Sequence, residues 1–216
     1  MIDRRKAIRN MGLSLGYIVA APTLISLVQS CKQDATVPWT PELLTRDQGS
    51  VLIKLVDTIL PKTETPSASE VQVHIFIDRF VNEILEKEEK ELFKMGMEKF
   101  TDKALTDSGT KSIADLKAED LEPVLAHALK TSKEDQDKYL KLIDEYTEAI
   151  RAGRPATLDD GISRFALANN LRKLTILSYK TSEYIGENVL AYLPVPGEYI
   201  ACGDLQELTG GKAWSI

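Results

Sequence analysis

Apolar residues recur at helical spacing through most of the chain beyond residue 45. In the first such stretch the apolar members are Val51, Leu52, Leu55, Val56, Ile59 and Leu60. This spacing places them on one face of an α-helix, which is expected to end at Pro61. Long runs of alternating β-branched residues are absent, so the pattern favours helices over strands.

A second and stronger apolar stripe follows the turn at residues 61–66. Its members are Val73, Phe76, Ile77, Phe80, Val81, Ile84 and Leu85. Ser67 and Glu70 have the spacing of a capping box, which predicts the start of this helix. The helix is expected to continue through the charged run at residues 86–91 as far as Phe100. We interpret that run as a solvated face with pairs of alternating sign, rather than as carboxylates that share an active site.

Three further helices are expected beyond a polar loop at residues 106–118. The first is short and covers residues 121–129, and the second covers residues 133–151. The third is expected to be capped by Thr157 and Asp160. Its apolar members are Ile162, Phe165, Ala166, Leu167, Leu171, Leu174, Ile176 and Leu177. Because it is apolar on more than one face, it is expected to be the central helix of a bundle.

The amino-acid composition of the chain changes at about residue 193. Prolines and glycines leave no room for a long helix there: Pro194, Pro196, Gly197, Gly203, Gly210 and Gly211. The predicted fold is therefore all-α, an irregular helical bundle with an extended Pro/Gly-rich C-terminal tail. One helical domain is expected over residues 46–216, preceded by a tether at residues 32–45. The tail is expected to lie on its own domain or on a partner.

The first 31 residues are typical of a twin-arginine (Tat) export signal. Arg4 and Arg5 are adjacent, and residues 11–28 carry no charge. The alternative is an uncleaved transmembrane anchor. That alternative is disfavoured because the uncharged stretch is near the lower length limit for crossing a bilayer and contains glycine and proline. The Tat translocase is accordingly an expected partner.

Cys31 stands where the lipid-accepting cysteine of a lipoprotein would stand. Residues 28–31 (Val-Gln-Ser-Cys) match a lipobox loosely, because the apolar and small residues are in place but Gln29 is atypical. The alternative is a cysteine that merely lies near a cleavage site, although no A-x-A-like site is nearby. We therefore expect the periplasmic face of the cell envelope as the location, with a lipid anchor holding the chain to the membrane.

The charge balance narrows the class of partner. Without residues 1–31 the chain has 23 Lys and Arg against 32 Asp and Glu, a net charge of −9. This argues against nucleic-acid binding, which requires a basic footprint. If Cys31 carries lipid, Cys202 is a single cysteine, and a free thiol, a bond to another chain and a small buried side chain all remain open.

No catalytic, cofactor-binding or metal-binding set of residues is expected in this chain. His74 shares a helix face with Glu70 and Asp78, but no second His or Cys lies nearby to complete a metal site. We interpret His74 as structural, and His127 has no comparable neighbours. Two cysteines cannot ligate an iron–sulfur cluster, and neither C-x-x-C-H nor G-x-G-x-x-G occurs. A Tat signal on a chain without a cofactor is therefore a mismatch that needs an explanation.

Three segments together resemble a known family. They are residues 55–68 (LVDTILPKTETPSA), 73–80 (VHIFIDRF) and the tail segments 192–202 (YLPVPGEYIAC) and 211–214 (GKAW). These segments are similar to the gluconate 2-dehydrogenase subunit 3 family, over most of residues 46–216. The family comprises small subunits of membrane-bound, flavin-dependent sugar and sugar-acid dehydrogenases.

The resemblance implies a subunit of an oxidoreductase complex that is not catalytic by itself. Such a subunit carries no cofactor and accompanies a large FAD-containing subunit of the glucose–methanol–choline type, often with a cytochrome c subunit. It is expected to supply the Tat signal for its folded partner, which explains the mismatch. The partner-facing candidates that follow are Tyr199, Cys202 and Trp214. The alternative function is a stand-alone helical envelope lipoprotein that acts as a binding or scaffold module.

Overall fold

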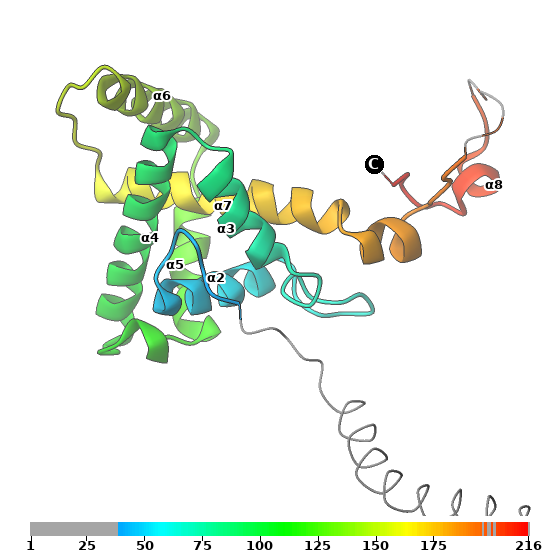
Figure 1. Ribbon diagram of the computed structural model, residues 1–216, viewed down its shortest axis with the longest axis horizontal. Coiled ribbons are helices and arrows are strands. Elements are labelled where there is room, and N and C mark those ends of the chain that lie inside the picture. The colour runs from blue at the N-terminus through cyan, green and yellow to red at the C-terminus, as the bar shows by residue number, and fades with distance from the viewer. Residues whose placement is uncertain (1–38, 196, 198–199, 201, 216) are drawn as a thin grey trace, which may run out of the picture. The chain divides into compact units, whose positions relative to one another are not determined.

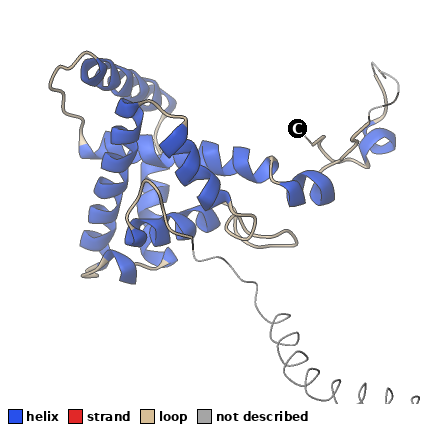
Figure 2. Cartoon of the chain, in the orientation of Figure 1, coloured by secondary structure: helices blue, strands red, loops and turns tan. Residues whose placement is uncertain are grey.

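The computed structural model describes residues 39–195, 197, 200 and 202–215. These residues form helices and no β-strand, which confirms the all-α prediction (Figures 1 and 2). The α-helices are α2 (Arg46–Ile59), α3 (Val73–Glu83), α4 (Lys87–Ser108), α5 (Ala118–Leu129), α6 (Lys133–Arg151), α7 (Asp160–Lys180) and α8 (Leu205–Thr209). Two short turns of other helical types are η1 (Ile113–Asp115) and the π-helical turn η2 (Ile185–Val189). None of the described helices is both long and apolar enough to cross a membrane.

Helix α7 is the centre of the bundle, as its apolar pattern predicted. It contacts α2, α3, α4, α5 and α6, and its most extensive contact is with α4. The two helices approach closely at Gly96, where a Cβ atom would lie 2.9 Å from the Cβ of Leu167 and 3.0 Å from the carbonyl oxygen of Ser163. Only glycine therefore permits this crossing. The fully buried residues around it include Leu52, Leu55, Ile77, Met97, Phe100, Leu121, Leu167 and Leu171.

The expected continuous helix through residues 73–100 is broken, and this prediction was wrong. Helix α3 ends at Glu83, and α4 begins at Lys87. Glu86 between them has an extended backbone, and its N–H donates to the Glu89 carboxylate over 2.9 Å. This local capping box starts a new helix inside the charged run, because it satisfies N–H groups that a continuous helix would have bonded itself. The run is also not wholly solvated: Glu88 is buried and pairs with Arg151 of α6.

The predicted box at Ser67 and Glu70 forms, but it closes a turn rather than starting α3. The Ser67 N–H donates to the Glu70 carboxylate over 2.8 Å. Helix α3 begins only after Gln72, whose φ of 61° places it in the left-handed region. The start of α7 also differs from the prediction, since Asp159 is its N-cap. The Asp159 carboxylate accepts the N–H groups of Gly161 and Ile162 over 2.7 and 3.2 Å.

Two carboxylates connect the first helices to the segments beside them. Buried Asp78 of α3 accepts the N–H groups of Glu42 and Leu43 over 2.7 and 3.2 Å. Asp57 of α2 accepts the N–H and the hydroxyl of Ser69 over 2.8 and 2.6 Å. Both carboxylates therefore organise backbone, which is the usual role of a hydrogen-bonded buried polar group.

Candidate partner-binding surface

Large apolar side chains are exposed mainly near the C-terminal end of the described chain. Of thirteen exposed large apolar residues, ten lie between residues 176 and 214. We call these ten the C-terminal apolar residues: Ile176, Leu177, Tyr184, Tyr192, Leu193, Val195, Ile200, Leu205, Leu208 and Trp214. A concentration of this kind is typical of a site for another macromolecule, because water penalises such a surface in an isolated chain.

The C-terminal segment, residues 185–215, folds back so that the described residues at its two ends meet. Ala191 forms an isolated parallel bridge with Trp214: the Ala191 N–H donates to the Ala213 carbonyl over 2.8 Å, and the Ser215 N–H donates to the Ala191 carbonyl over 2.9 Å. Between them lies α8, capped by the Asp204 carboxylate. Figure 1 shows α7 leading into η2 and onward to α8. The two ends of the segment are therefore hydrogen-bonded to each other, but its described residues form no hydrophobic core of their own.

Side chains of this segment are less buried than those of the helices before it. Ile185 and Gly186 are buried, but none of the described residues from Glu187 to Ser215 is. Gly186 lies so close to the end of the segment that a Cβ atom there would be 3.0 Å from the hydroxyl of Ser215. The described part of the segment has backbone contacts, but its side chains are exposed to solvent. Exposed apolar side chains of this kind are typical of a surface that another protein buries.

The junction between α7 and the segment is tied to the turn after α2. The Tyr179 hydroxyl donates to the carbonyl of Pro66 over 2.7 Å, and it lies 2.9 Å from the hydroxyl of Thr65. Lys62 of the same turn pairs with Glu70 over 2.5 Å. That ion pair and hydrogen bond raise the pKa of Lys62 and lower the pKa of Glu70. The turn at residues 61–68 is therefore a structural support for the end of α7.

The structure locates only some of the predicted site residues. Trp214 is 48% exposed, and Cys202 is exposed with a free thiol. Tyr199, and the predicted export and lipidation residues Arg4, Arg5 and Cys31, lie outside the described residues. Their roles stay predictions.

Sequence reasoning missed the contribution of α7 to this surface. Ile176 and Leu177 were expected in the core of the central helix, but they are 43% and 45% exposed. Tyr184, which the sequence pattern did not single out, is 52% exposed. No signal in the sequence marks this exposure, because both residues lie in the last turns of α7, beyond a crossing with α4 at Leu167 that only the structure shows.

The residues around His74 do not converge on a metal site. Glu70 is engaged with Lys62, and Asp78 accepts backbone N–H groups, so neither carboxylate is available to His74. Burial lowers the pKa of His74, and the nearby charge of Asp57 opposes that shift. No group of three or more His, Cys, Asp or Glu side chains in the described part of the chain is arranged to hold a metal ion. A neutral, buried His74 is consistent with its interpretation as structural.

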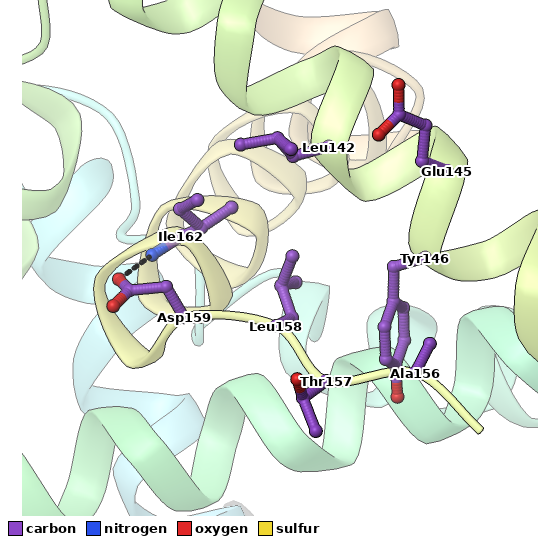
Figure 3. Close-up of a pocket in the computed structure, with 8 residues that line it drawn as sticks. All are labelled: Leu142, Glu145, Tyr146, Ala156, Thr157, Leu158, Asp159 and Ile162. Carbon is purple, nitrogen blue, oxygen red and sulfur yellow. Dashed lines mark hydrogen bonds between the residues drawn. The ribbon is translucent and has the colours of Figure 1, made fainter.

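One cleft in the bundle offers little chemistry. It has a volume of about 440 Å³ and lies between α6, α7 and the loop that joins them (Figure 3). Its lining residues are Leu142, Glu145, Tyr146, Ala156, Thr157, Leu158, Asp159 and Ile162. Asp159 is occupied in capping α7, and burial raises the pKa of Tyr146, which keeps the phenol protonated. The lining therefore supplies no nucleophile with an adjacent base.

Comparison with known proteins identifies one family. The family model described as gluconate 2-dehydrogenase subunit 3 matches residues 46–197, about 70% of the chain. The match begins at the first residue of α2 and ends within the C-terminal segment. The resemblance inferred from the sequence is confirmed over this range, and its last part, residues 198–216, lies beyond the match. Searches of curated proteins and of solved structures found no significant match.

Proposed function

The chain belongs to the gluconate 2-dehydrogenase subunit 3 family, and on that basis we propose that it is a non-catalytic subunit of a periplasmic flavoprotein dehydrogenase. In this proposal a large FAD-dependent subunit of the glucose–methanol–choline type oxidises a sugar or sugar acid. A cytochrome c subunit is a further candidate member of the complex. The observation that carries the proposal is the family match, since the family name itself describes one subunit of an enzyme.

The described residues support a structural role over a catalytic one. The cleft between α6 and α7 lacks a nucleophile with an adjacent base, and the carboxylates near His74 are engaged with other groups. A reaction centre requires convergent titratable groups around a site for the reacting atom. The exposed C-terminal apolar residues fit a subunit that completes its surface on another protein.

The export signal gives this subunit a second task in the proposal. Arg4 and Arg5 would direct the chain to the Tat translocase, and Cys31 would hold it by lipid on the periplasmic face of the envelope. In this proposal the large subunit takes up FAD before export and therefore crosses the membrane folded. A signal carried by its small partner would serve both chains.

The test is a pull-down of the tagged full-length chain from native membranes, followed by an absorbance scan of the eluate. We expect a large co-eluting protein and the spectrum of an oxidised flavin, because the colour belongs to the partner's cofactor. Deleting the gene is expected to leave the large subunit in the cytoplasm or inactive. A colourless single-band eluate, together with normal export of the flavoprotein without this chain, would favour the stand-alone lipoprotein instead.

A further inference from the structure

We propose that the C-terminal apolar residues are the surface on which this chain binds the large flavoprotein subunit. The inference rests on the proposed function and adds to it the part of the chain that makes the contact. The matching surface of the large subunit is apolar at its centre and basic at its rim.

The number of exposed side chains is sufficient for a stable interface. A fully enclosed aromatic side chain buries about 150–250 Å², so a half-exposed one retains roughly 100 Å² to bury. The ten C-terminal apolar residues are 39% to 78% exposed. Together they approach the ~800 Å² per partner of a standard protein–protein interface. The three other exposed large apolar residues in the described chain are Phe76 of α3, Ile84 at the end of α3 and Leu140 of α6, and three side chains cannot reach that area by themselves.

The composition of the surface is that of an interface centre rather than of ordinary exterior. Tyr184, Tyr192 and Trp214 are about half exposed, at 52%, 50% and 48%. Tyr and Trp are enriched among the residues that dominate binding energy, because they combine a large apolar body with one polar group. These aromatic side chains are therefore the expected anchors.

The charge of the surface argues against two other occupants. Residues 176–216 contain Lys180 and Lys212 against five acidic residues, a net charge of −3. The acidic members are Glu183, Glu187, Glu198, Asp204 and Glu207. Two copies of the segment would repel each other, and an anionic lipid surface would repel it too. A partner with Lys and Arg around an apolar centre satisfies both features of the segment.

The backbone of the segment is prepared for binding. The Ala191–Trp214 bridge and the capped α8 hold the exposed side chains on a structured loop. A pre-ordered loop loses less conformational entropy on association than a disordered one. The π-helical turn η2 connects it to α7, and π-helical turns occur frequently at functional sites.

The experiment compares two double variants of the tagged full-length chain in native membranes. The test variant is Tyr192→Ser with Trp214→Ser, and the control is Ile84→Ser with Leu140→Ser. All four side chains are large, apolar and exposed, at 50%, 48%, 65% and 40%. Loss of the anchors is expected to lower the flavin recovered per tagged chain at least about tenfold, while the control stays near the wild type. Circular dichroism of both purified variants is expected to keep the wild-type helical signal, since none of the four is buried.

Each outcome decides between the surface and the wider proposal. Wild-type flavin recovery from the Tyr192→Ser, Trp214→Ser variant would overturn the proposal that this surface binds the large subunit, and it would leave the subunit assignment intact. Equal losses in test and control variants would also overturn it. A wild-type chain that recovers no flavin would overturn the proposed function, and this inference with it. Sedimentation of the purified wild-type chain is expected to show a monomer, and a dimer abolished by the test variant would identify a second copy as the occupant.

Discussion

The bundle and the C-terminal segment are both rich in apolar residues but use them in opposite ways. In the bundle, α7 is enclosed by α2, α3, α4, α5 and α6, and its apolar side chains fill a core around Leu167 and Leu171. In the segment, none of the described side chains from Glu187 to Ser215 is buried. The apolar surface of the bundle is thus already buried within the chain, whereas the apolar surface of the segment is still available for burial against another protein.

The difference teaches where stability and binding are to be sought in this chain. Truncating a core side chain removes contacts that hold the fold, and it leaves a cavity as well. Truncating an exposed side chain of the segment removes surface that the isolated chain does not use. Substitutions of the same chemical kind should therefore have different effects in the two regions. In the bundle they should lower the free energy of unfolding, and in the segment they should lower co-purification of the partner.

The largest expected effect comes from the matched pair Phe100→Ala and Trp214→Ala. Phe100 of α4 is fully buried, so its loss is expected to lower the free energy of unfolding by about 3–5 kcal/mol. Trp214 is 48% exposed, and its loss is expected to change that free energy by no more than about 0.5 kcal/mol. Urea denaturation of the purified chains, followed by circular dichroism, measures both. A large loss of unfolding free energy for Trp214→Ala would mean that the segment stabilises the bundle, which would contradict the contrast between the two regions.

The second effect comes from the crossing of α4 and α7 at Gly96. Gly96→Val places atoms against the Cβ of Leu167 and the backbone oxygen of Ser163, neither of which is the flexible end of a side chain. The expected loss is about 1–3 kcal/mol, since overpacking outweighs the small gain in helix propensity. Ala126→Val on the exposed face of α5 is the control, and it is expected to cost no more than about 0.5 kcal/mol. Similar values for the two variants in a urea titration would show that the helices separate readily.

A smaller effect is expected at the junction of the two regions. Tyr179→Phe removes the hydroxyl that donates to Pro66 and is expected to cost about 0.5–1.5 kcal/mol. Tyr184→Phe, at an exposed tyrosine one turn further on, is the control and should leave the unfolding free energy unchanged. If Tyr179→Phe also lowers flavin recovery in the pull-down from chains that remain folded, the junction positions the segment for its partner.

The helices of the bundle could largely be predicted because their signals are local. The apolar period and the polar flanks gave the α6 range, residues 133–151, and the two-sided apolar pattern identified α7 as central. The break at Glu86 was missed because both the charges and the apolar residues there keep helical spacing. A new helix, α4, starts there because the Glu86 N–H donates to the Glu89 carboxylate, and periodicity does not report such bonds.

The candidate surface was predictable only in part. Proline and glycine marked the tail, and Trp214 followed from the family resemblance. The exposure of Ile176 and Leu177 was not predictable, because an apolar residue in a helix looks the same whether its own chain or another one covers it. Only the arrangement of the neighbouring helices distinguishes those two cases.

The smallest effect at neutral pH, and one confined to the bundle, concerns His74. Burial holds its pKa below the ordinary value of 6.5, so the unfolded chain takes up a proton at a pH where the folded chain does not. Above pH 6.5 both states are neutral and His74 contributes no pH dependence. As the pH falls below 6.5 the free energy of unfolding is expected to decrease, and the decrease levels off below the lowered pKa of the folded state.

His74→Gln removes this titration, so its unfolding free energy should fall less than that of the wild type between pH 7.5 and about 5.5. The lowered pKa of Glu70, whose ordinary value is 4.5, affects stability only at still lower pH, because its contribution is lost as that carboxylate protonates. Equal slopes for the wild type and His74→Gln would show that His74 is solvated in the folded state. Since His74 does not lie in the C-terminal segment, flavin recovery by chains that remain folded should not follow this titration, which keeps the pH response of the bundle separate from binding.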